Sequence, residues 1–368
     1  MGEREAVLAQ VAIEQRDWER AILHARASIA GGYAPARQLL AAATYKRADY
    51  GDAIRVLEEL GDDAGPAAVA LLVRLYLLMG DSAKGWQLLK ECCRSKAFGP
   101  SLYDLPRWSG ESIAGKRIAA WGGGYGDDIL FARFLPDLVR AGAIVTLQCR
   151  PALLRLMQSI PGLHVVLPLE IPADSPDYHV QTAELPALLG LGPNNVWPGE
   201  PYLHAEAATI PGKGLRIGLV WGSDARHWEA EDRSACLADM MPIAEVPDVR
   251  LFSLQVGAPA AQAKPPPSGM QIVDLAKDIR DFADTAAAIM GLDLVITIDT
   301  AVANLAGALG ARVWVALPFI PDYRWGLSGD RTPWFPSARC FRQPERGDWR
   351  SVFARMAEQL RSTLAHVA

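Results

Sequence analysis

The sequence predicts a region of α-helical repeats followed by two parallel α/β lobes of the Rossmann type. Three observations carry this prediction. A short motif recurs at residues 17, 49 and 81, strand-like runs alternate with helical runs from residue 116 onward, and a Pro-, Gly- and Asn-rich connection at 190–214 separates two such blocks. The 368 residues are enough for two or three domains.

The helical repeats are expected within residues 1–100. A turn, a small residue and an apolar helix recur in three motifs: Asp17-Trp18-Glu19-Arg20-Ala21, Asp49-Tyr50-Gly51-Asp52-Ala53 and Asp81-Ser82-Ala83-Lys84-Gly85. Helices are expected at 21–29, 39–45, 53–60, 67–79 and 85–89. The spacing is slightly shorter than the ~34 residues of tetratricopeptide repeats, which the motifs resemble in their turn and small-residue positions. Because one helix pair cannot bury its apolar face alone, the pairs are expected to stack, and the surface that stacking leaves suits a protein partner or a packing and dimerisation role equally.

Two α/β lobes are expected after the repeats, at residues 101–205 and 206–345, with a final helix in residues 346–368. The first lobe alternates strands and helices at 117–121, 128–141, 144–149, 152–160 and 165–167. The second continues the pattern at 215–221, 250–255, 285–290, 292–298, 301–309 and 313–317. We expect the final helix, at 349–366, to cross back onto the first lobe. A cleft between two such lobes is a usual place for a ligand.

The charge balance and the apolar runs exclude several classes of protein. A net charge of −5 and a pI of about 5.8 give no positive field for nucleic acid or an anionic membrane, so no nucleic-acid partner is expected. The longest apolar run, at 67–79, contains Arg74 and is shorter than the ~18 residues that cross a bilayer. The first residues lack a signal-peptide pattern, Ala6 argues against myristoylation, and five cysteines without a CxxC pair suit a reducing compartment. We therefore expect a cytoplasmic protein without a membrane span.

The first candidate site follows the strand at 117–121. The glycine-rich loop at 122–126 lets the backbone approach a ligand closely, and Asp127 and Asp128 stand where a helix begins. Either aspartate could cap the helix by accepting hydrogen bonds from free N–H groups. Alternatively, one carboxylate faces the cleft and acts as a general base for a hydroxyl group.

The second candidate site follows the buried strand expected at 292–298. Asp299 ends the strand, and Thr300 and Ala301 open a helix of small residues that also contains Asn304. The free N–H groups and positive dipole end of this helix could bind a diphosphate without a basic side chain. Asp299 could bind sugar hydroxyls or merely cap the helix, and the small residues could serve only close packing on the sheet.

The third candidate site is the polar loop after the strand at 215–221. Ser223, Arg226 and Arg233 lie in this loop. An arginine here could neutralise the charge that develops on a leaving diphosphate. The alternative is that both arginines are ordinary solvated surface residues.

Five motifs stand in a fixed order in the second part of the chain: Gly124-Tyr125-Gly126-Asp127 with Phe131-Ala132-Arg133-Phe134-Leu135-Pro136, Gly218-Leu219-Val220-Trp221, Asp281-Phe282-Ala283-Asp284-Thr285, Asp299-Thr300-Ala301-Val302-Ala303 with Leu305-Ala306-Gly307-Ala308-Leu309-Gly310, and Pro333-Trp334-Phe335-Pro336. Together they resemble the bacterial tetratricopeptide-repeat proteins whose catalytic half is similar to the heptosyltransferases of glycosyltransferase family 9. The resemblance covers residues 108–368, and the repeats extend it to nearly the whole chain. It implies a GT-B fold, with residues 101–205 on the acceptor side and 206–345 on the nucleotide-sugar side. It also implies inversion at the anomeric carbon and no catalytic metal or cofactor, and relatives with repeats are often linked to protein glycosylation, notably of flagellin.

The resemblance also assigns roles to residues by their position in the motifs. It makes Asp127 the catalytic base. It makes Asp299 and Thr300 the contact for the donor sugar and its phosphate. The three candidate sites add further residues expected to bind the donor or its nucleotide: Gly124, Gly126, Ser223, Arg226, Arg233, Ala301 and Asn304. The absence of an Asp-x-Asp triplet agrees with metal independence, because a divalent ion that bridges a diphosphate usually needs paired carboxylates. The implied partners are a nucleotide-sugar and an acceptor protein or peptide on the repeats, and helical repeats also serve homo-oligomers.

Three places depart from the family pattern, one of them the loop Trp228-Glu229-Ala230-Glu231, where relatives tend to be rich in Asn and Arg. Gly122-Gly123 stands where the family usually has Glu-Gln, and Asn304 where it usually has His, which fits a different sugar or a loss of turnover. Two further hypotheses therefore stay open: a catalytically inactive scaffold or protein-binding module, and a nucleotide-sugar epimerase, which shares the two-lobed fold but does not explain the repeats. The loop at 318–334, with Tyr323, Arg324 and Trp325, could cover a nucleobase or pack the lobes together. The sequence does not distinguish among nucleotides, sugars or acceptors.

Overall fold

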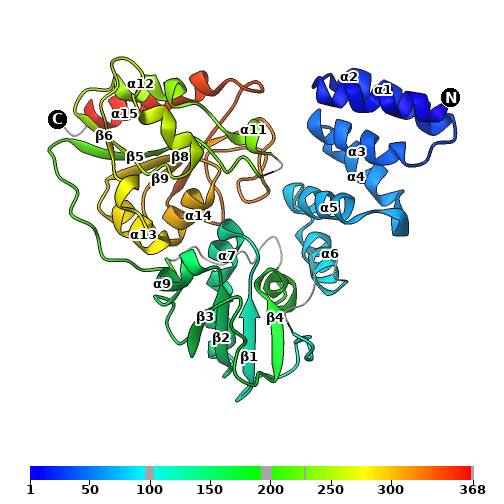
Figure 1. The fold of residues 1–368 in the computed structure, drawn as a ribbon, viewed down its shortest axis with the longest axis horizontal. Helices are drawn as coiled ribbons and strands as arrows, with labels where there is room; N and C mark the ends of the chain where they lie inside the picture. The colour runs from blue at the N-terminus through cyan, green and yellow to red at the C-terminus, as the bar shows by residue number, and fades with distance from the viewer. Residues whose placement is uncertain (96–102, 192–200, 228, 366–368) are drawn as a thin grey trace. The chain divides into compact units, whose positions relative to one another are not determined.

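The computed structural model describes residues 1–95, 103–191, 201–227 and 229–365 (Figure 1). The chain forms a helical unit, Met1–Leu102 with Leu189–Asn195, and an α/β unit, Tyr103–Leu188 with Val196–Ala368. The expected boundary between residues 100 and 101, residues 192–200 of the expected connection, and His366 at the end of the expected final helix lie outside the described residues. Each unit has its own buried apolar core.

The described part of the helical unit consists of helices in antiparallel pairs, each helix packed against the next (Figure 1). Their bounds are α1 Gly2–Glu14, α2 Trp18–Ala30, α3 Ala36–Lys46, α4 Tyr50–Glu58, α5 Pro66–Leu78 and α6 Ser82–Arg94, with a 3₁₀ turn at Gly61–Asp63. A helix is present at each of the five expected places. The expected helices are preceded by α1, which no motif in the sequence marks.

The recurring motif marks the start of the second helix in each pair. The N-cap residues of α2, α4 and α6 are the repeated aspartates Asp17, Asp49 and Asp81. Asp17 accepts a hydrogen bond from the Arg20 N–H (3.1 Å), which satisfies a free donor of the first turn. The small residue of each motif is buried, and a Cβ on Gly85 would lie 2.5 Å from Leu77 Cδ2. The motif therefore encodes a helix start and a close contact between paired helices.

The first lobe of the α/β unit contains a parallel sheet with strand order β3-β2-β1-β4. The strands are β1 Arg117–Trp121, β2 Ile144–Cys149, β3 Val165–Pro168 and β4 Tyr178–Gln181. The connecting helices are α7 Tyr125–Phe131, α8 Leu135–Arg140, α9 Leu154–Met157 and α10 Leu185–Leu188. The single helix expected at 128–141 is wrong: a 3₁₀ turn at Ala132–Phe134 separates α7 from α8, and Pro136 lacks the N–H that would continue the ladder. The helix expected at 152–160 is likewise shorter, because a 3₁₀ turn at Pro151–Leu153 precedes α9.

The second lobe contains a parallel sheet with strand order β10-β9-β8-β5-β6-β7. The strands are β5 Leu215–Val220, β6 Val249–Ser253, β7 Ile272–Asp274, β8 Leu294–Ile298, β9 Val313–Leu317 and β10 Ala338–Arg342. The helices are α11 Ala230–Arg233, α12 Met241–Ala244, α13 Phe282–Met290, α14 Ala301–Ala308 and α15 Trp349–Ala365. Figure 1 shows α13 and α14 on one face of this sheet and α12 and α15 on the other. Helices on both faces explain why β8 is buried along its whole length and apolar except for Thr297.

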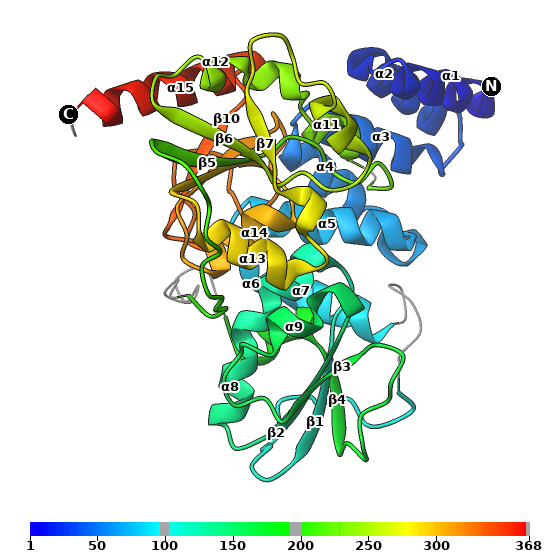
Figure 2. The same cartoon turned by 60° about the vertical axis from the view of Figure 1, so that its left-hand side comes forward.

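The final helix packs on the second lobe. α15 contacts α12, β9 and β10 (Figure 2). Val352, Phe353 and Met356 are fully buried in the same apolar cluster as Ile217 of β5 and Ile296 of β8. The expected crossing onto the first lobe is therefore wrong, because the apolar face of α15 completes the core of its own lobe. No helix in the described part of the chain is long and apolar enough to cross a membrane.

The strand order brings separate loops to common edges, because parallel strands end at the same edge of a sheet. In the second lobe β9, β8 and β5 are neighbours, so the loops at 318–334, 299–300 and 221–229 begin side by side. In the first lobe β1 and β2 are neighbours, and their loops begin at Gly122 and Arg150. All the candidate residues lie in these loops or in the helices that follow them.

Candidate functional site

The side chain of Asp128 organises the glycine loop after β1. Its Oδ1 atom accepts a hydrogen bond from the Gly123 N–H (2.7 Å), and the residue is 5% exposed. A Cβ on Gly122 would lie 1.8 Å from the same oxygen, so this position has no room for a side chain while Asp128 keeps its place. Burial raises the pKa of Asp128 to about 7, an effect that the Gly123 N–H opposes and Asp127 reinforces. Asp128 is thus an internal part of the loop.

Asp127, in contrast, is accessible and forms an ion pair with the second lobe. Its side chain is 52% exposed, and its Oδ1 atom accepts a hydrogen bond from Nη2 of Arg324. The Arg324 side chain is 11% exposed, and its Nη1 atom lies 3.3 Å from Asp322 Oδ1. Burial of the guanidinium disfavours its charge, but nearby acidic groups outweigh burial and raise the pKa of Arg324 well above its ordinary value. These groups are Asp322, Tyr323, Asp127 and Asp299.

The first turn of α7 packs directly on α14. A Cβ on Gly126 would lie 3.1 Å from Asn304 Nδ2 and 3.9 Å from the Cα of Ala301. The space beside Gly126 is therefore taken by α14, which corrects the expectation that this glycine lets a ligand approach. Gly124 is the N-cap of α7, with Asp127 Oδ2 3.5 Å from its Cβ position.

The N-terminus of α14 has no side-chain cap. Thr300 is the N-cap residue, but its hydroxyl lies 3.2 Å from that of Thr297 and makes no capping bond. Asp299 precedes the N-cap position, so the alternative in which Asp299 caps the helix is wrong. Because the first-turn N–H groups of a helix have no intrahelical partners, the α14 start at Ala301 keeps free donors and the positive end of the helix dipole.

Asp299 and Arg233 are brought together although 66 residues separate them in the sequence (233 to 299). Arg233 Nη2 lies 2.6 Å from Asp299 Oδ2, and the two side chains are largely buried. The second oxygen of Asp299 and the side-chain oxygen of Asn304 are buried and have no hydrogen-bond partner among the described residues. An unsatisfied buried acceptor costs roughly 1–3 kcal/mol, so these two oxygens are suited to accept hydrogen bonds from a ligand.

The other two predicted residues of the polar loop are engaged elsewhere. The Ser223 hydroxyl lies 2.9 Å from that of Ser234, a contact within the loop. Arg226 has an 88% exposed side chain and pairs with Asp224, whose pKa this contact holds below its usual range. The prediction that Arg226 faces the donor is therefore not supported by its position, and the surface alternative describes it correctly.

The sequence left open whether Arg324 covers a nucleobase or packs the two lobes together, and no motif pointed to Arg150. Arg150 follows β2, donates to the Gly123 carbonyl (2.8 Å from Nε) and lies over the Tyr125 ring at 5.2 Å. Arg150 directly follows β2 and Arg324 lies in the loop that follows β9, so both belong to the sheet edges that also carry Asp127 and Asp299. That position in the topology is the signal by which they could have been found.

Two of the motifs meet at Arg133, which is 2% exposed. Its guanidinium carbon lies 4.9 Å from the ring centre of Tyr202, 5.1 Å from that of Trp334 and 4.9 Å from that of Phe335. The guanidinium also donates to the carbonyls of Leu130 (3.1 Å) and Trp334 (3.0 Å). The Phe131–Pro136 and Pro333–Pro336 motifs thus share a structural role in joining the lobes.

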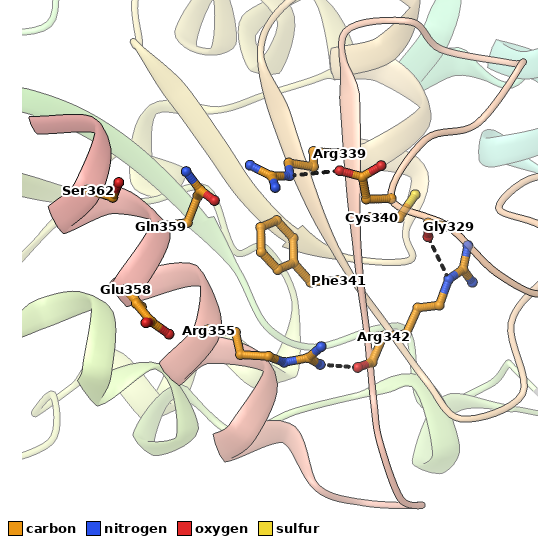
Figure 3. Close-up of a pocket in the computed structure, with 10 residues that line it drawn as sticks. Gly329, Arg339, Cys340, Phe341, Arg342, Arg355, Glu358, Gln359 and Ser362 are labelled. Atoms are coloured by element: carbon orange, nitrogen blue, oxygen red, sulfur yellow. Dashed lines mark hydrogen bonds and ion pairs between the residues drawn. The ribbon is translucent and has the colours of Figure 1, made fainter. Parts of the chain in front are cut away.

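A hollow of about 530 Å³ lies elsewhere, between β10 and α15 (Figure 3). Its guanidinium groups already have partners: Arg342 donates to the carbonyls of Trp325 and Gly326, Arg339 pairs with Asp330, and Arg355 donates to the Arg342 carbonyl. None of the predicted site residues lines this hollow. In the described ranges, no three His, Cys, Asp or Glu side chains are grouped so as to hold a metal ion.

The α/β unit has the fold of the two-lobed GT-B glycosyltransferases. The crystal structure of a family 9 glycosyltransferase from Veillonella parvula superposes with a TM-score of 0.51, over 70% of this chain and 99% of that chain, at 12% identity. No family model matches the sequence.

The chain is also similar in sequence to a relative of known name. The protein FlbA of Caulobacter vibrioides is 28% identical to this chain, over 79% of this chain and 54% of that protein. The chain therefore spans about half the length of this relative.

Proposed function

We propose that this chain is an inverting, metal-independent glycosyltransferase that moves a sugar from a nucleotide-sugar donor to a hydroxyl acceptor. The observation that carries the proposal is the ion pair between Asp127 and Arg324. It joins an accessible carboxylate of the first lobe to the strand-end edge of the second lobe, where the uncapped N-terminus of α14 begins. The fold shared with family 9 glycosyltransferases supports the same function.

In this mechanism Asp127 is the general base. Its carboxylate removes the proton from the acceptor hydroxyl while the hydroxyl oxygen attacks the anomeric carbon of the donor. The bond from that carbon to the phosphate oxygen breaks, so the sugar ends on the acceptor, the proton on Asp127 and the nucleoside diphosphate departs. A single displacement of this kind inverts the anomeric configuration.

The start of α14 binds the donor in this proposal. The free N–H groups near Thr300 and Ala301 meet the negative charge of the diphosphate. The unpartnered oxygens of Asp299 and Asn304 accept hydrogen bonds from the donor, and Arg233 holds the Asp299 carboxylate in place. Asn304 is two-percent exposed and touches α7, so the residue that replaces the family's histidine is a contact between the lobes as well.

The proposed acceptor is a protein or peptide, such as flagellin, held by the helical unit. Its stacked helix pairs support this, because arrays of helical pairs form extended binding surfaces. The tetratricopeptide assignment of these pairs is part of the same proposal. Transfer of labelled sugar to flagellin, compared with transfer to free sugars, tests the acceptor class.

Nucleotide binding provides the first test of the donor site. The full chain is melted with UDP, GDP, ADP or CMP in EDTA, since a ligand that binds the native state raises the melting temperature. We expect one of the three diphosphates to raise it, with CMP as the monophosphate comparison, and Asp299→Ala or Arg233→Ala to remove the effect. Arg226→Ala is the matched control from the same loop and should leave the shift unchanged. If no nucleotide shifts the wild-type protein, the inactive scaffold becomes the better hypothesis.

Turnover provides the second test. Asp127→Asn should lower the rate by ~10²- to 10⁴-fold, as expected for the loss of a positioned base, while the fold is kept. The NMR coupling constant of the product's anomeric proton should show inversion. Normal activity in this variant, or retention in the product, would refute the mechanism.

A further inference from the structure

The Arg324 guanidinium is shared between carboxylates of unequal accessibility. Nη1 faces Asp322 in its own loop at 3.3 Å, and that carboxylate is 11% exposed. Nη2 donates to Asp127 of the other lobe, whose side chain is 52% exposed. An exposed ion pair is weaker than a buried one, so the contact with Asp127 is the more easily exchanged of the two.

Arg324 also has binding capacity that the described contacts do not use. Its Nε–H group is buried and has no hydrogen-bond partner among the described residues. A guanidinium offers five N–H donors in a planar fork that matches phosphate oxygens in pairs. The Arg324 loop follows β9, and α14 follows the neighbouring strand β8, so both begin at one edge of the sheet.

The other arginines of the proposed donor site are less free to bind a phosphate. Arg233 is held by Asp299, a partner with a 3% exposed side chain, and Arg226 is exposed and paired with Asp224. Asp127 is therefore the carboxylate that a phosphate could displace with the smallest loss of buried contacts.

We propose that Arg324 binds Asp127 and the donor diphosphate in alternation. When the donor site is empty, Arg324 holds the Asp127 carboxylate. When a diphosphate arrives, the guanidinium turns to the phosphate oxygens and releases Asp127 to accept the proton of the acceptor hydroxyl. This inference rests on the proposed function, and it makes donor binding the step that frees the base, so the donor binds before the acceptor reacts.

Competition for Arg324 predicts the direction in which each substitution changes the affinity for the nucleotide. If Asp127 and the diphosphate compete for Arg324, then Asp127→Asn should bind the nucleoside diphosphate more tightly than the wild type. The energies of exposed ion pairs correspond to an affinity for the nucleoside diphosphate that is about 1.5- to fivefold higher in Asp127→Asn. Arg324→Met should weaken binding by about ten- to a hundredfold, as expected for lost charge-assisted hydrogen bonds.

The experiment is a double-mutant cycle measured by titration calorimetry on the full chain. The probe is the nucleoside diphosphate that stabilises the wild type in the melting screen. The gain from Asp127→Asn should vanish in the Arg324→Met background, because the two groups then no longer compete. Asp293→Asn is the matched control, since Asp293 pairs with Arg216 at the start of β5 and β8, away from the strand ends, and should not alter the affinity.

The possible outcomes separate this inference from the proposed function. Unchanged or weaker binding by Asp127→Asn, or a gain that persists without Arg324, overturns the alternation while leaving the donor site intact. Failure of every variant to bind any nucleotide overturns both proposals. Arg324→Lys keeps the buried charge and is used if Arg324→Met does not fold, and it should retain part of the competition.

Discussion

Replacement of Asp128 by asparagine should change how stability depends on pH. Burial raises the pKa of this carboxyl from its ordinary value of 3.8 to about 7, so the folded chain holds the proton more tightly than the unfolded chain. The resulting stabilisation is complete below about pH 4 and is lost as the pH rises through about 7. Between about pH 5 and about pH 8, the free energy of unfolding therefore falls by about 2–3 kcal/mol because of this carboxyl group. Asparagine can still accept the hydrogen bond of Gly123 but does not titrate, so this contribution disappears in the variant.

The assay is a series of thermal melts of the wild type and Asp128→Asn across that pH range at one scan rate. For a unit of this size, the melting temperature of the wild type relative to that of Asp128→Asn should change by roughly 5–10 °C across this pH range. Asp293→Asn should keep the wild-type slope, because the hydrogen bonds from Arg216 hold the pKa of Asp293 below its usual value and outside this range. Parallel pH profiles for the wild type and Asp128→Asn would refute the argument that Asp128 is a buried, proton-holding part of the loop.

Three glycine substitutions test the packing. Gly85→Ala should destabilise the helical unit by roughly 1–3 kcal/mol, since its Cβ would lie 2.5 Å from a Leu77 methyl carbon. Gly51→Ala, whose Cβ meets open space in α4, should be neutral or stabilise by up to about 1 kcal/mol, and urea denaturation followed by circular dichroism compares the two. Gly307→Ala should destabilise the α/β unit by at least about 1–3 kcal/mol, because its Cβ would lie 2.3 Å from Phe335 Cγ, and a wild-type melting temperature would contradict this.

Much of the fold could be predicted because it rests on local patterns. The repeated aspartates and small residues predict the helix starts, since capping and close packing act over a few neighbouring residues. The run of β-branched and apolar residues in β8 and the small-residue helix after it predict a buried strand and its crossover. In contrast, β4, β7 and β10 were not predicted. They are edge strands, and unlike the edge strand β3 they lack a continuous apolar run, so their formation depends on tertiary pairing. The predicted packing of α15 on the first lobe was wrong, because an amphipathic helix does not specify which core it will cover.

The loops that form the candidate site could be predicted from the sequence, but the ion pairs between their side chains could not. The glycine loop, Asp299 and the start of α14 stand directly after strands, where topology favours ligand residues. The sequence could not show that Arg233 pairs with Asp299, that Arg226 faces solvent, or that Arg324 crosses to Asp127. These contacts join residues 66 to 197 positions apart or depend on the fold of a polar loop. Nor could the sequence show that Asp128 fills the space where a side chain of residue 122 would lie, because that contact depends on the fold of the loop.

The aromatic cage of Arg133 restricts how the lobes can open. Its rings come from the second lobe and the connection, and its cation comes from the turn that directly follows α7. An opening that withdrew the rings and the Trp334 carbonyl would leave a buried cation uncompensated, a change that costs about 3–5 kcal/mol in comparable cases. Opening movements that keep the cage leave the lobes in contact at Arg133. Asp127 lies on the short helix that precedes Arg133, so an opening that keeps the cage moves Asp127 little relative to the second lobe.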